Sequence, residues 1–210
     1  MEAEFWKNGI LLLDGAMGTV LQQRGLSPQG RPELLNLTEP ELLNSVYKEY
    51  IAAGSQVIYA NTFGANGLKL AKTGHSVEEV VGAAIAVAKK AAAGTGTLVA
   101  LDVGPLGELL EPMGTLSFER AYDLFREMAE AGAKAGADLI VVETMTDLYE
   151  AKAALLAAKE AAHLPVFVTM SFDAGGRTFT GCTVASMART LEGLGADAIG
   201  LNCSLGPDLL

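Results

Sequence analysis

Three nine-residue segments of the chain align without gaps, and each begins with glycine. They cover residues 54–62, 136–144 and 195–203. In each, a small and a polar residue lead into an apolar stretch, and a polar residue stands seven places after the glycine: Asn61, Glu143 and Asn202. Glycine is the usual left-handed end of a helix, and short apolar stretches are typical of buried strands. The repeat therefore predicts helix–strand units whose strands end in polar side chains.

Six short apolar runs alternate with longer alanine-rich stretches such as residues 80–93 and 151–162. This alternation is typical of a parallel sheet that helices cover. The strands that we predict are residues 10–13, 56–60, 97–101, 138–142, 165–171 and 197–201. Their spacing of roughly 30 to 45 residues favours an α/β fold of the (βα)8 TIM-barrel type, with about six of the eight βα units present. The alternative is a doubly wound open sheet, but residues 14–18 do not form its G-x-G-x-x-G fingerprint.

Capping signals predict where several helices begin. Thr38 and Glu41 form a capping box, Asp147 and Glu150 can form another, and Ser117 precedes an apolar helical face. No linker or low-complexity segment interrupts the pattern, so we assign residues 1–210 to one domain.

Charge and hydropathy exclude several classes of function. With 15 basic and 25 acidic residues the formal net charge is −10, which disfavours binding to nucleic acid or to anionic lipid. No apolar run approaches the ~18 residues of a membrane span, and no signal peptide is apparent. We therefore expect a cytoplasmic protein that binds neither nucleic acid nor membranes.

The carboxyl ends of barrel strands carry the active site in this fold class. The polar residues at those ends are the candidate site residues: Asp14, Asn61, Thr62, Asp102, Glu143, Thr144, Asn202 and Cys203. Taken singly, each could equally be a loop start or a helix cap. Asp14 and Glu143 could form an acid/base pair, as in glycosidases, or could hold the amine of a substrate.

Cys203 is the most informative of these residues, because a thiol in a tight turn at the barrel rim suits a nucleophile or a metal ligand. The histidines are His75, in a polar turn, and His163, before a strand, so we expect neither a Cys–His pair nor a histidine-rich metal site. Cys182 is predicted to be structural. The segment Gly104–Gly107 is a weak candidate for a phosphate-binding loop.

Five motifs together resemble the homocysteine S-methyltransferase family, and above all the homocysteine-binding module of its cobalamin-dependent members. They follow the family's order along essentially the whole chain. The motifs are Leu-Asp-Gly-Ala-Met-Gly-Thr (13–19), Ala-Asn-Thr-Phe-Gly-Ala-Asn (60–66), Asp-Val-Gly-Pro (102–105), Val-Glu-Thr-Met-Thr-Asp (142–147) and Gly-Leu-Asn-Cys-Ser-Leu-Gly-Pro (200–207).

The resemblance implies a barrel in which cysteine thiolates hold a catalytic zinc, and in which the thiol of homocysteine is methylated to give methionine. Cys203 would be the first zinc ligand. Asp14 and Glu143 would hold the amino-acid part of the substrate, and the backbone of Gly15, Ala16 and Met17 would lie near its carboxylate. Asn61, Thr62 and Asn202 belong to the strand-end motifs around the substrate, where we expect the two asparagines to support the site rather than to coordinate zinc.

Zinc would remove the thiol proton, because a free thiol with a pKa near ~8.5 is mostly protonated at neutral pH. Methylcobalamin on other domains of the full-length protein, which would also include a methyltetrahydrofolate domain, is the expected methyl donor. Betaine or S-methylmethionine are the alternatives. Other classes that remain open are a non-catalytic amino-acid-binding barrel and an unrelated barrel hydrolase that uses Asp14 and Glu143.

One departure from the family pattern matters for the zinc. The family's other two ligands are an adjacent Cys-Cys pair, and this chain contains no such pair. About two βα units of a complete barrel are also missing. We therefore expect a C-terminally incomplete barrel, a fragment or one that a second chain completes, which as it stands binds zinc weakly and does not turn over.

Overall fold

The computed structural model describes residues 9–27, 30–206 and 208. Within them lies one five-stranded sheet, in which neighbours follow the order of the sequence and every pair is parallel. The strands are β1 (Val57–Tyr59), β2 (Leu98–Val103), β3 (Leu139–Met145), β4 (Val166–Met170) and β5 (Ala198–Leu201). They match five of the six predicted strands. Residues 10–13 were predicted as a further strand, but they form only an isolated bridge between Leu13 and Val57.

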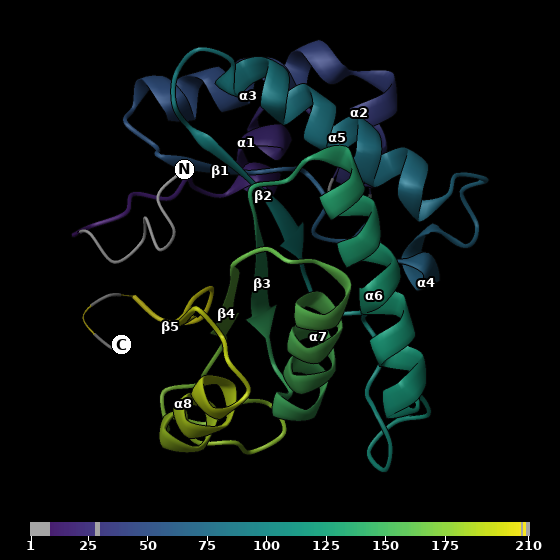
Figure 1. Cartoon of the computed structure of the whole chain (residues 1–210), viewed down its shortest axis with the longest axis vertical. Coiled ribbons are helices and arrows are strands. Elements are labelled where there is room, and N and C mark those ends of the chain that lie inside the picture. The colour runs from purple at the N-terminus through teal and green to yellow at the C-terminus, as the bar shows by residue number, and fades with distance from the viewer. Residues whose placement is uncertain (1–8, 28–29, 207, 209–210) are drawn as a thin grey trace.

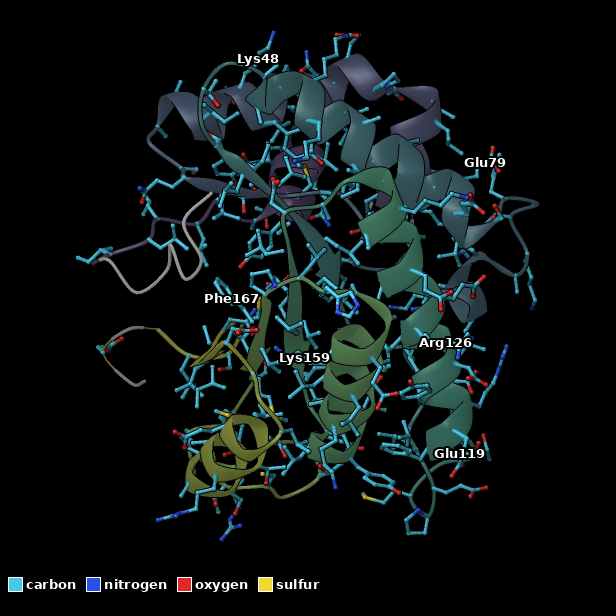
Figure 2. The ribbon with its side chains drawn as sticks, in the orientation of Figure 1. Lys48, Glu79, Glu119, Arg126, Lys159 and Phe167 are labelled. Atoms are coloured by element: carbon cyan, nitrogen blue, oxygen red, sulfur yellow. The ribbon has the colours of Figure 1, made fainter. Side chains whose placement is uncertain are left out.

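Helices connect the strands and run along the outer side of the sheet (Figure 1). The helices between strands are α4 (Gly67–Leu70), α5 (Val77–Ala92), α6 (Phe118–Ala135), α7 (Leu148–Ala161) and α8 (Val184–Gly193). Before β1 lie α1 (Met17–Gln23), a 3-10 turn (Pro32–Leu34), α2 (Leu35–Thr38) and α3 (Pro40–Ala52). Figure 2 labels Glu119 and Arg126 on α6, where both side chains are exposed. In the described part of the chain, no helix has the length and hydropathy to cross a bilayer.

Two apolar layers lie on the two faces of the sheet. The larger fills the space between strands and helices, where small side chains allow close packing: a Cβ on Gly132 of α6 would come within 2.7 Å of Leu101 in β2. The smaller lies on the inner face and contains Val57, Ala100, Leu139, Val141 and Phe167. Because side chains alternate along a strand, the residues two positions further along each strand also lie on the inner face, toward the carboxyl ends.

The polar residue that enters each repeat strand fixes the neighbouring strand. Oδ2 of Asp138 accepts hydrogen bonds from the Val99 N–H and from Lys89 Nζ, both at 2.7 Å. Asp197 repeats the arrangement: its Oδ2 accepts from the Val166 N–H at 2.8 Å and from Lys159 at 2.9 Å. Lys159, on α7, is labelled in Figure 2.

In the first repeat a glutamine takes the place of the aspartate, and Gln56 Oε1 accepts from the Leu12 N–H at 2.9 Å. Each of the three residues also donates its own N–H to a carbonyl of the same neighbouring segment, at 2.8 Å. The repeat therefore sets the register between adjacent units.

The predicted helix signals are confirmed except for the two capping boxes. Gly54, Gly136 and Gly195 have positive φ angles of 107°, 92° and 84°. The side chain of Ser117 caps α6. Asp147 caps α7 through the Tyr149 N–H, but Glu150 does not complete the box, because its Oε1 accepts from the Leu106 N–H at 2.7 Å. The capping box at Thr38 is wrong, because Thr38 ends α2 and its hydroxyl donates to Leu34 O, while α3 begins after Glu39 without a side-chain cap.

We predict that Asp138→Ala lowers the free energy of unfolding by about 1–3 kcal/mol, since it leaves the buried N–H of Val99 without its acceptor. Glu130→Ala removes one partner of the exposed Arg126–Glu130 pair on α6 and is the control. It should cost no more than about 0.5 kcal/mol. Urea unfolding of both variants measures the difference, and equal losses would contradict the role assigned to Asp138.

Candidate active site

A cavity of about 580 Å³ lies at the carboxyl ends of the strands, where sequence analysis places the site. This volume is in the range of small-ligand sites. Among the described residues that line it are four carboxylic acids and one thiol, and none is lysine, arginine or histidine: Asp14, Glu33, Asp102, Glu143 and Cys203. The cavity is therefore strongly acidic and suits a cationic group.

Strand alternation places the polar lining. Tyr59, Asp102, Glu143 and Thr169 line the cavity, and each stands two residues after a member of the inner apolar layer. A change of one residue in strand register would turn these side chains to the opposite face. The register bonds of the repeat are therefore a condition for the site.

Asp14 follows the bridge residue Leu13. Its N–H donates to Val57 O at 3.0 Å, and its Oδ2 accepts from the Tyr59 N–H at 2.9 Å. Burial raises the pKa of Asp14 to about 7, and the charge of Glu143 acts in the same direction, while the bond from Tyr59 opposes it. Burial and the surrounding carboxylates also raise the pKa of the Tyr59 hydroxyl.

Glu143 stands at an irregularity of β3, where the register to β4 shifts between Val142 and Met145. The next residue, Thr144, has a positive φ of 60°, which is rare for a β-branched residue. Asn202 stabilises this conformation, since its side chain accepts from the Thr144 N–H at 3.1 Å and donates to Thr144 Oγ1 at 2.9 Å. The same amide donates to Glu143 Oε2 at 3.0 Å. Burial raises the pKa of Glu143.

Cys203 is exposed at the cavity and also has a positive φ, 54°. Its loop is held to the end of β4, because Ser171 Oγ donates to Asn202 O at 2.9 Å. Cys182, by contrast, lies before α8, half-buried, and its thiol contacts Thr183 O at 3.2 Å. Cys182 does not line the cavity.

The described residues do not form a complete metal site. No group of three or more His, Cys, Asp or Glu side chains in the described part of the chain is arranged to hold a metal ion. Cys203 can supply one thiolate, so the fit to a zinc on several thiolates is partial.

Asn61 and Thr62 serve the structure around the cavity. Asn61 lines it, but its amide donates to Pro32 O at 2.6 Å and its N–H donates to Tyr47 Oη at 2.8 Å. Thr62 is fully buried and is not among the lining residues. Its hydroxyl donates to Asp102 O at 2.7 Å and accepts from the Asp102 N–H at 3.0 Å.

The segment from Gly15 to Met17 lines the cavity as expected. Tyr50 packs beneath it and donates to Ala16 O at 3.2 Å. A Cβ on Gly15 would stand 3.0 Å from the Tyr50 ring, which explains the glycine.

Five polar or aromatic residues of the described lining are not among the candidates from the sequence: Thr19, Glu33, Tyr59, Phe63 and Thr169. Tyr59 could have been found from strand alternation, and Phe63 from its place in the 60–66 motif. Glu33 precedes α2 and carries no such signal. It reaches the cavity because its Oε1 accepts from the Gly64 N–H at 2.8 Å. Gly104 allows Phe63 to lie here, since a Cβ would come within 2.5 Å of the ring.

The fold and the cavity define a class: a barrel-type α/β protein with an acidic, thiol-bearing ligand site at the carboxyl ends of its strands. The chain belongs to the homocysteine S-methyltransferase family, which it matches over residues 11–210.

Two curated relatives are methionine synthases, from Mycobacterium tuberculosis (33% identical) and Mycobacterium leprae (32%), each over 218 residues. Both matches cover 94% of this chain but 18% of the relative, so the chain spans less than a fifth of their length.

Solved structures of the homocysteine methyltransferase MmuM from Escherichia coli share the fold. Its metallated form has a TM-score of 0.81 at 25% identity, covering 94% of this chain and 76% of that chain. Its oxidized form gives 0.83 at 27% identity, covering 95% and 75%. The predicted family and the barrel-type α/β fold are therefore confirmed.

We predict that Asp14 makes the protein less stable as pH rises from about 4 to about 7. The pKa of Asp14 is raised from 3.8 to about 7, so the folded state binds this proton more tightly than the unfolded chain does. The resulting stabilisation is complete below about pH 4 and is lost as pH rises through about 7. Asp14→Asn should flatten this decline in urea unfolding, relative to the exposed, charge-matched Asp123→Asn. Parallel profiles of the two variants would refute the prediction.

Proposed function

We propose that this chain binds homocysteine in its acidic cavity and presents the thiol of homocysteine for methylation to methionine. The observation that carries the proposal is the cavity lining, which combines four acids with the exposed thiol of Cys203. Membership of the homocysteine S-methyltransferase family supports it.

In this proposal Asp14 and Glu143 hold the ammonium group of homocysteine. Both carboxyls are fixed from the protein side, by the Tyr59 N–H and by the Asn202 amide, and each has a second oxygen that a ligand can contact. The first turn of α1 has no side-chain cap, which fits a substrate carboxylate near the backbone of Gly15–Met17. These groups supply position rather than proton transfer.

We also propose that Cys203 is one ligand of a zinc ion. These 210 residues contain one other cysteine, Cys182, in a different loop, so the remaining thiolates would have to come from outside them. The metallated form of the E. coli relative is in keeping with a metal in this family.

The methyl donor that we propose is methylcobalamin, carried with a methyltetrahydrofolate domain on other parts of a longer protein. The similarity to two methionine synthases supports this choice over betaine and S-methylmethionine. A second candidate function is amino-acid binding without catalysis. The lack of a three-ligand metal cluster among the described residues favours it for this chain by itself.

We expect Glu143→Gln to weaken homocysteine binding roughly ten- to hundredfold, because an ammonium–carboxylate contact is replaced by a neutral one. Glutamine can still accept from Asn202, so the fold should be kept. Isothermal titration calorimetry on the 210-residue chain measures the affinity, with the exposed Glu130→Gln as control. If Glu143→Gln binds as tightly as this control, Glu143 does not hold the ammonium.

For zinc, we expect the 210-residue chain to bind weakly and to lose most of that binding in Cys203→Ser. A competition titration with a chromogenic chelator measures both proteins, and Cys182→Ser is the matched control. Tight, stoichiometric binding by the unmodified chain would contradict the expectation.

A further inference from the structure

Among the described lining residues two acids, Glu33 and Asp102, have no role in the family resemblance or in the proposed function. Of the two, Asp102 is the buried one. It lies near the carboxyl end of β2, on the inner face of the sheet, and lines the cavity with Asp14 and Glu143. The residue is 7% exposed.

Among the described residues, no donor reaches Oδ1 of Asp102, although the atom is buried. The corresponding carboxyls of Asp14, Glu33 and Glu143 each accept a hydrogen bond from the protein. A buried acceptor without a donor is costly. Five buried side-chain atoms of the described residues have no hydrogen-bond partner, and Asp102 Oδ1 is the one carboxyl oxygen among them.

One side chain, that of Thr62, binds both backbone polar groups of Asp102. The hydroxyl of Thr62, fully buried, accepts from the Asp102 N–H and donates to the Asp102 carbonyl. The side chain of Asp102 therefore starts from a rigid position, and rotation about χ2 can turn either carboxyl oxygen to the cavity.

The electrostatic surroundings determine what kind of donor fits. Glu143, Asp14, Glu33 and Cys203 act on Asp102, and all of them are acidic groups. Burial first, and then these neighbours, raise the pKa of Asp102 well above its usual range. A cationic ligand with several N–H donors would relieve both the repulsion and the missing hydrogen bond.

We propose that Asp102 contacts the ammonium group of the ligand directly, as a third carboxyl beside Asp14 and Glu143, and so makes the cavity select primary amines. This inference rests on the proposed function for the identity of the amine, homocysteine. An ammonium group has three N–H donors, and three carboxyls on three neighbouring segments can accept them. Asp102 is thus a specificity-determining residue.

The test compares ligands with and without the amine in Asp102→Asn and in Glu33→Gln. Glu33→Gln is the matched control, because it also removes one acid from the lining while its amide oxygen can still accept from Gly64. Calorimetry on the 210-residue chain measures the binding affinities of two ligand pairs. In each pair only the first ligand has an amine: homocysteine against 4-mercaptobutanoate, and norleucine against hexanoate. Circular dichroism checks the fold, and Asp102→Ser replaces Asp102→Asn if that variant is unfolded.

We expect Asp102→Asn to weaken the binding of homocysteine and norleucine at least tenfold. The binding of 4-mercaptobutanoate and hexanoate, which lack the amine, should be unchanged or tighter. Glu33→Gln should change the amine affinities by less than about threefold. The proposal is overturned if both variants weaken amines equally, if Asp102→Asn weakens all four ligands alike, or if the unmodified chain shows no preference for amines. If Asp102→Asn weakens the binding of norleucine but not of hexanoate, while homocysteine does not bind to the unmodified chain, the role of Asp102 is supported and the proposed function is wrong.

Discussion

The hydrogen bonds from the first polar residue of each repeat to the neighbouring strand are the interaction on which the rest of the structure depends. Asp138 and Asp197 each bind an N–H of the neighbouring strand and a lysine of the helix that precedes this neighbouring strand, and thus join sheet and helix at one atom. These bonds fix the register, and the register decides which side chains face inward. The acidic cavity is therefore a consequence of bonds at the opposite ends of the same strands.

The site itself works against stability. Buried carboxyls line one cavity, none of its described lining residues is basic, and the pKa values of Asp14, Asp102 and Glu143 are all raised. Such an arrangement survives because strands and loops hold the acids in place, and it persists where it serves binding. A bound cation would offset the repulsion among these carboxyls, so the same charges that destabilise the empty cavity favour the binding of a cationic ligand.

The sequence predicted the parallel sheet because apolar runs and glycine-ended helices repeat at regular spacing, and both signals are local. It predicted Asp14, Glu143, Asn202 and Cys203 as site residues because strand ends converge in this fold, and all four line the cavity. Residues 10–13 were predicted as a strand but form only an isolated bridge, because an apolar pattern does not reveal how many backbone hydrogen bonds a segment makes with its neighbour. Glu33 and the structural use of Thr62 depend on contacts across 31 and 40 residues, and no local pattern records them.

Asn202 shows why the acid and the thiol should be regarded as one unit. Its side chain holds Glu143 and the left-handed Thr144 on β3, while its backbone leads directly into the left-handed Cys203 after β5. Asn202 thus links the two left-handed residues: its side-chain amide is hydrogen-bonded to Thr144, and Cys203 follows it in the chain. A displacement of Cys203 would have to move Asn202 and with it Glu143. The direction of the thiol and the position of the carboxyl that we assign to the ammonium are consequently set together, and β4, between the two strands, fixes their separation.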